Sequence, residues 1–543
     1  MSLYRSHLPA RFNLAQALTQ AQPAAGRGNQ TYMVCGEQRL TFQGLAEQTA
    51  RMAGALEALG VRPGERVMLL TGENLRFPPL FLGVIHRGAV AVPLNPLLTP
   101  QDHLGMLHDS QASLLVVEDN LWPLLARARL PAGLKVALTG QGSESLETGL
   151  PRLETLAASQ PAERAPEGCG PDAPAFWLYT SGSTGVPKAA IHRHRDMMAA
   201  WELYGRGVLN LRPGEVTFSA PKFFFAYGLG NSLAFPLLAG ATAVISGQPP
   251  TPRALLETLA RHRPAVFYAV PTHLNGLLNL YQAWREGRED PPAVLPTLDH
   301  LRLAVSAGET LPAPLWHRWK AHFSADLLDG LGTTELFHIV ISNRPGASRP
   351  GTTGTLVEGV EARLARLPDP SAAEQDNPPT VVELPEAAPG ETGLLLVRSE
   401  AASPAYWNRP ELSQAVMAQG WTVTGDLFQR SAEGWFTYVG RNDDMMKVGG
   451  SWVAPAEVEA ALMTHPAVAE CAVAGAATPD GLGQAKAFVV LNGNYAPEDS
   501  LAEELKAHMA QQMAAFKVPR WVAFVHHLPK TATGKIQRYK LRG

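Results

Sequence analysis

The sequence has only three cysteines among its 543 residues, Cys35, Cys169 and Cys471. Because their number is odd and they lie far apart, we expect neither a disulfide framework nor a cysteine-rich zinc site. An excess of one charge is also lacking, since 46 Lys and Arg residues oppose 49 Asp and Glu residues. The net charge of −3 therefore gives no electrostatic footprint for nucleic acid or for an anionic membrane.

Long apolar runs are absent as well. Runs such as PLFLGVI, at 79–85, are far shorter than the roughly 20 residues that a membrane span needs. The first residues, MSLYRSHLPARFNLAQ, carry charge and contain no continuous apolar segment, so we expect no signal peptide. These absences predict a cytoplasmic protein without membrane contact. The composition that remains, 45% hydrophobic and 17% charged, is that of a globular chain with room for several domains.

Strand and helix patterns alternate along most of the chain. TYMVCG predicts a strand, Thr41 can cap a helix that carries Leu45 and Leu56 on one face, and VMLL at 67–70 predicts a buried strand. The alternation returns at GATAVIS, TPRALLETLARH and AVFYAV. Repeated βαβ units predict an α/β fold of parallel-rich sheets with helices on both faces. The proline-rich segment 366–393 predicts loops and turns around a more β-rich part.

A change of composition at 440–450, GRNDDMMKVGG, predicts a domain boundary, because charge and glycine follow an apolar strand there. The residues beyond it alternate helix and strand patterns of their own, which is enough for a small α+β domain. We therefore predict a large N-terminal domain at 1–440 and a small C-terminal domain at 441–543.

The stretch YTSGSTGVPK, at 179–188, crowds glycines, hydroxyl side chains and one lysine into ten residues. Glycine lets backbone N–H groups approach a ligand closely, hydroxyls donate hydrogen bonds, and Lys188 adds a positive charge. This combination suits a polyphosphate. It differs from the usual P-loop, in which glycine directly precedes lysine, because Val186 and Pro187 separate Gly185 from Lys188.

Three further polar motifs follow this stretch. DGLGTTE, at 329–335, combines a glycine turn, two threonine hydroxyls and the Glu335 carboxylate, which suits a nucleotide with Mg²⁺. TGD, at 424–426, offers a carboxylate to a ribose diol, and PKTATGK, at 529–535, places Lys535 in a polar loop. Taken singly, each motif is as readily a surface turn, a helix cap or an exposed lysine.

In this order, and with GRNDD at 440–444, the motifs resemble the adenylate-forming superfamily of acyl-CoA synthetases, peptide-synthetase adenylation domains and firefly-type luciferases. The resemblance covers about residues 10–543. It is closest to the benzoate–CoA ligases, in FFFAYGLGNSLAFPLLAGAT, DGLGTTELFHIVISNRPG and KTATGKIQRYKLR.

The resemblance implies an ATP- and Mg²⁺-dependent ligase that joins a carboxylate to coenzyme A through an acyl-adenylate, with release of pyrophosphate and AMP. It implies catalytic roles for Lys535, Thr334 and Glu335, with Glu335 also holding Mg²⁺. The implied ATP-binding residues are Thr180, Ser181, Gly182, Ser183, Thr184, Gly185 and Lys188 at the phosphates, Ala307, Gly308, Glu309, Asp329, Gly330, Leu331, Gly332, Thr333 and Thr334 from the adenine to the α-phosphate, and Asp426 and Arg441 at the ribose.

The resemblance also implies that the C-terminal domain is mobile about a hinge at Asp443. Lys535 would then leave the site, and the loop with Lys447, Gly449 and Gly450 would enter on the coenzyme A side. The implied acyl pocket comprises Phe225, Ala226, Tyr227, Gly228, Ala307, Gly332, His338 and Ile339. Small residues at 226, 307 and 332 leave room for a flat ring, and Tyr227 offers it an aromatic face or edge. Without the resemblance, an FFF run indicates ordinary core and a lone histidine a structural one.

Several alternatives stay open. The acid is benzoate or a substituted benzoate, or alternatively 2-aminobenzoate, a furoate-like acid or a medium-chain acid. FFFAYGLG contains no acidic residue to pair with the ammonium of an amino acid. Two alternatives belong to other functional classes than a CoA ligase: a non-catalytic nucleotide-binding relative, and an adenylating domain that loads a carrier protein. His192 and His194 form an HxH pair without an apparent third ligand, so we expect no metal there. A lysine acetyltransferase or deacetylase acting on Lys535 and a homodimer are the candidate partners beyond the small molecules.

Overall fold

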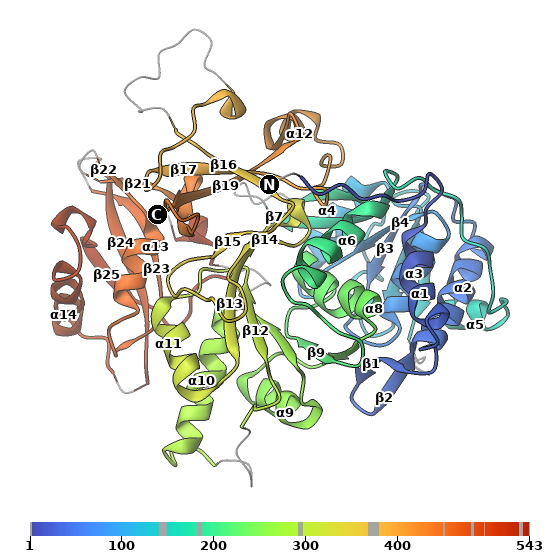
Figure 1. Cartoon of the computed structure of the whole chain (residues 1–543), viewed down its shortest axis with the longest axis horizontal. Coiled ribbons are helices and arrows are strands. Elements are labelled where there is room, and N and C mark those ends of the chain that lie inside the picture. Colours follow the sequence, from blue (N-terminus) through green and yellow to red (C-terminus); the bar gives the residue numbers. More distant parts are fainter. Residues whose placement is uncertain are drawn as a thin grey trace.

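The computed structural model describes residues 3–140, 149–181, 187–290, 297–367, 380–448, 451–478, 483–493, 495–530 and 536–541. Two large sheets with their helices form most of the molecule (Figure 1). A five-stranded antiparallel sheet follows them in the chain, and a small group of strands and helices ends it. The fold class is therefore α/β with parallel-rich sheets and a separate C-terminal part, as the sequence predicts.

The first large sheet has six strands in the order β6-β5-β3-β4-β7-β8, and only the β7–β8 pair is antiparallel. Its strands are β3 (Arg66–Leu70), β4 (Val90–Pro93), β5 (Leu114–Glu118), β6 (Lys135–Thr139), β7 (Pro174–Ser181) and β8 (Pro187–Arg193). The hairpin between β7 and β8 carries the predicted phosphate loop, and its tip lies outside the described residues.

The second large sheet has nine strands in the order β15-β14-β13-β12-β11-β9-β10-β1-β2. They are β1 (Thr31–Cys35), β2 (Gln38–Thr41), β9 (Val216–Ser219), β10 (Thr242–Ile245), β11 (Val266–Ala269), β12 (Leu303–Ala307), β13 (Asp326–Gly332), β14 (Ile339–Ser342) and β15 (Thr355–Leu356). In sheet order, the neighbouring strands from β13 through β12, β11, β9 and β10 to β1 are parallel. Strand β2 is antiparallel to β1, β14 to β13, and β15 to β14.

The helices of the two sheets are α1 (Leu14–Ala24), α2 (Phe42–Ala58), α3 (Phe77–His86), α4 (Pro100–Ser110), α5 (Leu153–Ala158), α6 (His194–Ala200), α7 (Ala226–Leu229), α8 (Phe235–Ala239), α9 (Pro252–His262), α10 (Pro271–Arg285) and α11 (Ala313–His322). Trp201–Arg206 and Gly230–Ala234 are π-helical. Helix α2 begins where the sequence predicts, because the Thr41 hydroxyl accepts a hydrogen bond from the backbone N–H of Gly44.

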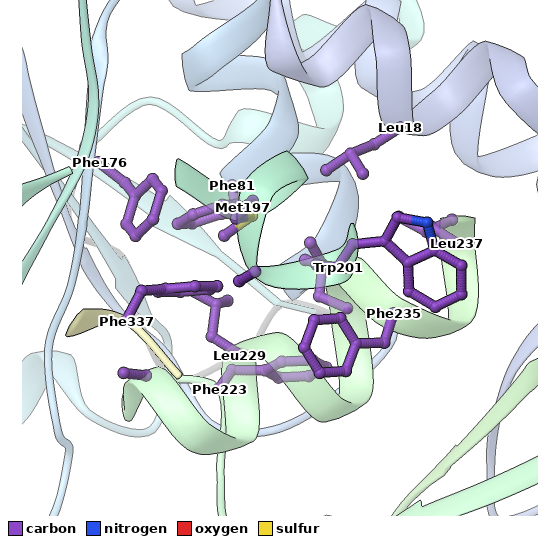
Figure 2. Close-up of a cluster of buried hydrophobic side chains, with 14 of the residues drawn as sticks. Leu18, Phe81, Phe176, Met197, Trp201, Phe223, Leu229, Phe235, Leu237 and Phe337 are labelled. Atoms are coloured by element: carbon purple, nitrogen blue, oxygen red, sulfur yellow. The ribbon is translucent and has the colours of Figure 1, made fainter. Parts of the chain in front are cut away.

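The main core lies between the two sheets and includes α1, α3, α8 and the inner faces of both sheets. Figure 2 shows its aromatic centre, with Phe81, Phe176, Phe223 and Phe337 close together and Trp201 beside Phe235. A second cluster packs α9, α10 and α11 on the other face of the nine-stranded sheet, and a third packs α4 on the six-stranded sheet. Helices therefore cover both faces of the sheets, which keeps parallel strands buried.

The β-rich part is an antiparallel sheet of β16 (Glu361–Ala365), β17 (Thr392–Arg398), β18 (Met417–Ala418), β19 (Trp421–Arg430) and β20 (Phe436–Arg441), with α12 (Pro410–Val416) before β18. The C-terminal part contains β21 (Met446–Val448), β22 (Ser451–Val453), α13 (Pro455–Leu462), β23 (Val468–Ala477), β24 (Gly483–Leu491), α14 (Asp499–Ala510) and β25 (Trp521–Phe524). This part has its own hydrophobic core and lies at the opposite end of the molecule from β3 and α2 (Figure 1).

No helix among the described residues combines the length and the apolar character that crossing a bilayer requires.

Candidate active site

Strand β8 brings the first predicted site residues to the edge of the six-stranded sheet. Thr180 of β7 pairs with Lys188 of β8, so both flank the phosphate loop. Segment 403–407 lies along the other edge of β8. The N–H of Ile191 donates to the Ala405 carbonyl, and the N–H of Trp407 donates to the Ala189 carbonyl. Segment 403–407 thus extends the sheet beyond β8 and carries Tyr406 next to Lys188.

Glu335 meets two groups in this corner. The Tyr406 hydroxyl donates a hydrogen bond of 2.5 Å to Glu335 Oε1, and Lys188 Nζ lies 3.9 Å from the same oxygen. Lys188 Nζ also lies 4.2 Å from the centre of the Tyr406 ring, within the range of a cation–π contact. Burial lowers the pKa of Lys188 and Arg441 lowers it further, while Glu335 and Asp443 act to raise it. Lys188 is therefore poorly hydrated, which strengthens its attraction for an anion.

The main chain of Thr334 and Glu335 is also held. The ring of His192 lies with Nε2 at 2.8 Å from the Thr334 carbonyl oxygen. The N–H of Ser403 donates to the Glu335 carbonyl at 2.7 Å. Both neighbours come from the β8 region, so the loop after β13 is fixed against the other large sheet.

The predicted ribose-binding pair lies on adjacent strands. Asp426 of β19 pairs with Arg441 of β20, and Arg441 Nη1 lies 3.3 Å from Asp426 Oδ1. Arg441 Nη2 is equally close to Asp443 Oδ1. The two carboxylates raise the pKa of Arg441 despite its burial. The Arg441 guanidinium thus contacts both Asp426, the predicted ribose ligand, and Asp443, the predicted hinge residue.

The predicted adenine border lies along β12 and β13, where Ala307 pairs with Gly330 and Ser306 with Asp329. Asp329 is buried, its Oδ1 has no hydrogen-bond partner among the described residues, and burial raises its pKa to about 8. Gly308 has φ +87°, a conformation that glycine adopts without strain. The Glu309 carboxylate accepts a hydrogen bond from the Thr272 hydroxyl at 3.1 Å.

The predicted acyl pocket is formed by two segments that contact each other. The Tyr227 ring lies 5.6 Å from the His338 ring, and the Tyr227 hydroxyl donates to the Val305 carbonyl of β12 at 3.0 Å. Burial lowers the pKa of His338 to about 3, so its ring is neutral. The ring lies with Nε2 at 3.1 Å from Asn231 Oδ1. Ala226 and His338 are almost fully buried, which gives the pocket wall a fixed shape.

Two glycines of this wall are required by close contacts. A Cβ at Gly332 would lie 2.5 Å from the carbonyl oxygen of His338, and a Cβ at Gly228 would lie 2.1 Å from the carbonyl oxygen of Lys222. Both approaches are to backbone atoms, so no side chain could move aside. The loop 333–338 is therefore folded back tightly on the end of β13.

This loop contains a strained turn at Phe337. Phe337 has φ +63° and ψ −45°, and the N–H of His338 donates to the Leu336 carbonyl at 2.8 Å. These values define a γ-turn of the rare kind with positive φ. A buried, non-glycine residue in this region costs about 1–3 kcal/mol, which the surrounding contacts must offset. The turn separates Glu335, on the phosphate side, from His338, on the acyl side.

The remaining predicted residues are placed as follows. Phe225 is half-buried and lies edge-to-face with Phe224, Leu331 pairs with Ile341, Thr333 precedes the turn, and the side chain of Ile339 packs over Gly330. Lys447 is exposed in β21, beside Gly483. Gly182, Ser183, Thr184, Gly185, Gly449, Gly450 and Lys535 lie outside the described residues, as does the side chain of Ser181.

Sequence reasoning missed Tyr406 and dismissed His192 after considering only metal binding. YWNRPE at 406–411 has no glycine, and its one arginine stands three residues from Tyr406, so the segment lacks the pattern that marks a phosphate site. Among the described residues no cluster of three or more His, Cys, Asp or Glu side chains could hold a metal ion. One carboxylate, that of Glu335, still fits Mg²⁺, because this ion usually binds one or two carboxylates together with the phosphates of its substrate.

An α/β fold that holds a partly buried carboxylate, Glu335, opposite Lys188 beside the predicted phosphate loop is typical of a nucleotide-dependent enzyme. The sequence profile of the AMP-binding enzyme family matches residues 20–407, and that of the AMP-binding enzyme C-terminal domain matches residues 457–535. The chain belongs to the AMP-binding enzyme family.

Within this family the chain is similar to aryl–CoA ligases. It is 42% identical over 538 residues to a benzoate–CoA ligase of Thauera aromatica, which covers 98% of this chain and 96% of that protein. Its structure resembles that of an anthranilate CoA ligase in complex with anthranoyl-AMP, with a TM-score of 0.87, 38% identity and coverage of 98% and 97% of the two chains. It also resembles a benzoate CoA ligase from Burkholderia xenovorans, with a TM-score of 0.86, 38% identity and coverage of 98% and 100%.

Proposed function

We propose that this protein is an AMP-forming acid–thiol ligase that converts an aryl carboxylate, benzoate or a substituted benzoate, into its coenzyme A thioester. One observation carries the proposal. The loop after β13 presents Glu335 to Lys188 at one end and His338 to Tyr227 at the other. A single loop thus lies between a cationic corner suited to phosphates and an aromatic wall suited to a ring.

The first half-reaction joins two anions. An oxygen of the carboxylate attacks the α-phosphorus of ATP, the bond to the β-phosphate oxygen breaks, and pyrophosphate leaves. Lys188 lies where it can bind the phosphates beside the loop at 181–186, and Glu335 would hold Mg²⁺. When bound, this ion neutralises phosphate charge. Thr334 would contact the α-phosphate, and Lys535 would bridge the carboxylate and the α-phosphate. Such preorganised charges offset the repulsion of the reactants.

The second half-reaction consumes the acyl-adenylate. The sulfur of coenzyme A attacks the acyl carbon, its thiol proton is lost, and AMP leaves with the electrons of the acyl–oxygen bond. We propose domains at 1–440 and 441–543 with a hinge at Asp443, so that Lys535 gives way to the loop with Lys447, Gly449 and Gly450. Arg441, which holds both Asp426 and Asp443, supports a hinge adjacent to the nucleotide.

The acyl wall favours a neutral ring. Ala226, Ala307 and Gly332 are small, Tyr227 is aromatic, and His338 is neutral. A ring with a neutral 2-amino group is the second candidate, because a relative with 38% identity is named an anthranilate CoA ligase. Acetylation of Lys535, a homodimer and a cytoplasmic location stay predictions. Acetylation would remove the lysine charge and stop the first half-reaction, which mass spectrometry combined with a pyrophosphate assay would reveal.

The experiment is a panel of acids assayed separately for pyrophosphate release and for thioester formation. We expect benzoate to turn over, with 2-aminobenzoate, 2-furoate and hexanoate as the comparison acids. Turnover of hexanoate alone would contradict the aryl pocket. Lys535→Ala should lower adenylation by about 10²–10³ while thioester formation from supplied benzoyl-adenylate survives. Equal loss of both half-reactions would contradict the division of roles.

A further inference from the structure

The strained turn at Phe337 needs a partner that holds it, because it joins the two halves of the proposed site. Glu335 lies two residues before the turn centre and His338 one residue after it. A relaxed turn would move both residues, since the loop is only six residues long between β13 and β14. Displacement of a reacting group by about 1 Å can cost 10²-fold in rate.

His192 contacts both sides of this turn. Its Nε2 lies 2.8 Å from the Thr334 carbonyl oxygen before the turn, and its ring lies edge-on to the Phe337 ring at 5.5 Å. A face of the imidazole stacks on the Phe176 ring at 4.9 Å. Phe176 and Phe337 also contact each other directly, as Figure 2 shows. The imidazole therefore fixes a backbone oxygen and an aromatic side chain of the same loop.

Asp196 sets the orientation of the His192 ring. Its Nδ1 lies 3.2 Å from Asp196 Oδ2, and both residues are fully buried. Asp196 is in turn held by Arg193, whose backbone N–H donates to Oδ2 at 2.9 Å and whose Nε donates to Oδ1 at 3.0 Å. A carboxylate and a carbonyl both accept hydrogen bonds. A hydrogen bond to the Thr334 carbonyl oxygen therefore requires the hydrogen on Nε2.

Resting on the function proposed above, we propose that His192 is a positioning residue of the adenylation step: oriented by Asp196, it holds the Thr334 carbonyl and the Phe337 ring so that Glu335 and His338 keep their places. The imidazole itself touches neither reactant. It acts through the loop, whose backbone and aromatic contacts it supplies together.

The other member of the HxH pair shows what a purely structural histidine looks like in this chain. His194 is also almost fully buried, and its Nδ1 accepts a hydrogen bond from the Leu14 N–H at 3.0 Å. That bond ties helix α1 to the start of α6 and involves no residue of the 333–338 loop. Loss of either histidine should lower the melting temperature, but only His192 should alter the chemistry.

The test compares two substitutions at the same position. His192→Phe keeps a flat ring for Phe176 and Phe337 but has no hydrogen to give to Thr334. His192→Gln places an amide N–H close to the position of Nε2. We expect H192F to lower kcat for pyrophosphate release by about 10²-fold and H192Q to stay within about fivefold of the wild type. Calorimetric titration with a magnesium-bound non-hydrolysable ATP analogue gives a second readout, in which H192F should bind at least about threefold more weakly than H192Q.

Three outcomes separate the hypotheses. Inactivity of the wild-type protein with every acid would overturn the function proposed above. With an active wild type, equal kcat values for H192F and H192Q would overturn the positioning role. His194→Phe is the matched control, and it should lower the melting temperature while leaving kcat within about twofold. A fall in kcat for H194F as large as that for H192F would also overturn the inference, because a general loss of packing would then explain both.

Discussion

Tyr406 contacts both Glu335 and Lys188. Its hydroxyl donates to Glu335 Oε1 at 2.5 Å, and the centre of its ring lies 4.2 Å from Lys188 Nζ. Burial and the Glu335 carboxylate both raise the pKa of Tyr406, so the phenol keeps its hydrogen and remains a donor. Tyr406 therefore fixes one carboxylate oxygen of Glu335 and contributes to the apolar surroundings of Lys188.

Replacing Tyr406 by Phe should impair adenylation. A hydrogen bond to a charged group contributes about 1.5–3 kcal/mol, so we expect pyrophosphate release to fall by roughly 10- to 100-fold. Tyr32→Phe is the matched control, because its hydroxyl donates to the Ser232 carbonyl at 3.2 Å in the core. In urea titrations Y406F should lose about 1.5–3 kcal/mol of stability and Y32F about 1 kcal/mol. Unchanged turnover in Y406F would remove Tyr406 from the site.

Gly332→Ala should distort the acyl wall. The added Cβ would lie 2.5 Å from the His338 carbonyl oxygen, which is a backbone atom and cannot turn away. Overpacking of this kind typically costs about 1–3 kcal/mol, and we expect the KM for benzoate to rise more than the KM for ATP. Gly105→Ala is the control, since nothing lies within 4 Å of its Cβ position in helix α4 and alanine favours helix. Equal melting temperatures for the two variants would contradict the close contact.

The buried ion pair of Glu73 and Lys222 predicts a pH dependence of stability. Lys222 Nζ lies 2.6 Å from Glu73 Oε2 and 2.6 Å from the Ser246 carbonyl oxygen. Burial raises the pKa of Glu73 to about 7 from its ordinary value of 4.5, although Lys222 acts to lower it. The folded protein therefore keeps a proton that the unfolded chain releases between these values. Its free energy of unfolding should fall as the pH rises through this window.

Glu73→Gln replaces the titrating carboxyl group by an amide that does not titrate, so its stability should lack this pH dependence. Urea unfolding at pH 5 and pH 8 should show that the wild-type protein loses more stability than E73Q between the two values. Parallel changes in both proteins would mean that Glu73 is ionised throughout. Lys222 directly precedes the Phe223–Gly228 segment, so its ion pair with Glu73 also helps to hold that segment in place.

Arg538 should matter for the first half-reaction alone. It lies three residues after Lys535, and its Nη2 donates to Glu459 Oε2 at 2.7 Å while its Nε donates to Oε1 at 3.1 Å. Arg538→Lys keeps the charge but loses this two-pronged contact, so we expect adenylation to fall by about tenfold. Thioester formation from supplied benzoyl-adenylate should be retained. Arg520→Met, an exposed change on the same part of the chain, is the control; a loss of both half-reactions in R538K would argue for general disorder of that part.

Local signals were sufficient for much of the fold. The Thr41 cap, strands β1, β3, β10 and β11 and helix α9 lie where the sequence predicts them, because each depends on nearby residues. The partner of β1 could not be predicted. Besides its hairpin neighbour β2, strand β1 pairs with β10, some 200 residues later, and only the packing of the complete core selects that second pairing.

The site followed the same rule. Residues within glycine- and charge-rich motifs, such as Lys188 and Glu335, could be predicted as site residues because their residue types indicate their chemistry. Tyr406 and His192 were not, because their roles depend on which neighbours they meet. The turn at Phe337 was least accessible, since a positive φ usually selects glycine and a phenylalanine there gives no local signal.

In the proposed site, the six residues between β13 and β14 contact both reactants. A substitution that reshapes the ring-facing end at His338 is transmitted through a stiff γ-turn to the carboxylate at Glu335. Adaptation to a new acid should therefore proceed through the opposite wall, at Phe225–Tyr227, where side chains can be exchanged without disturbing the handling of ATP.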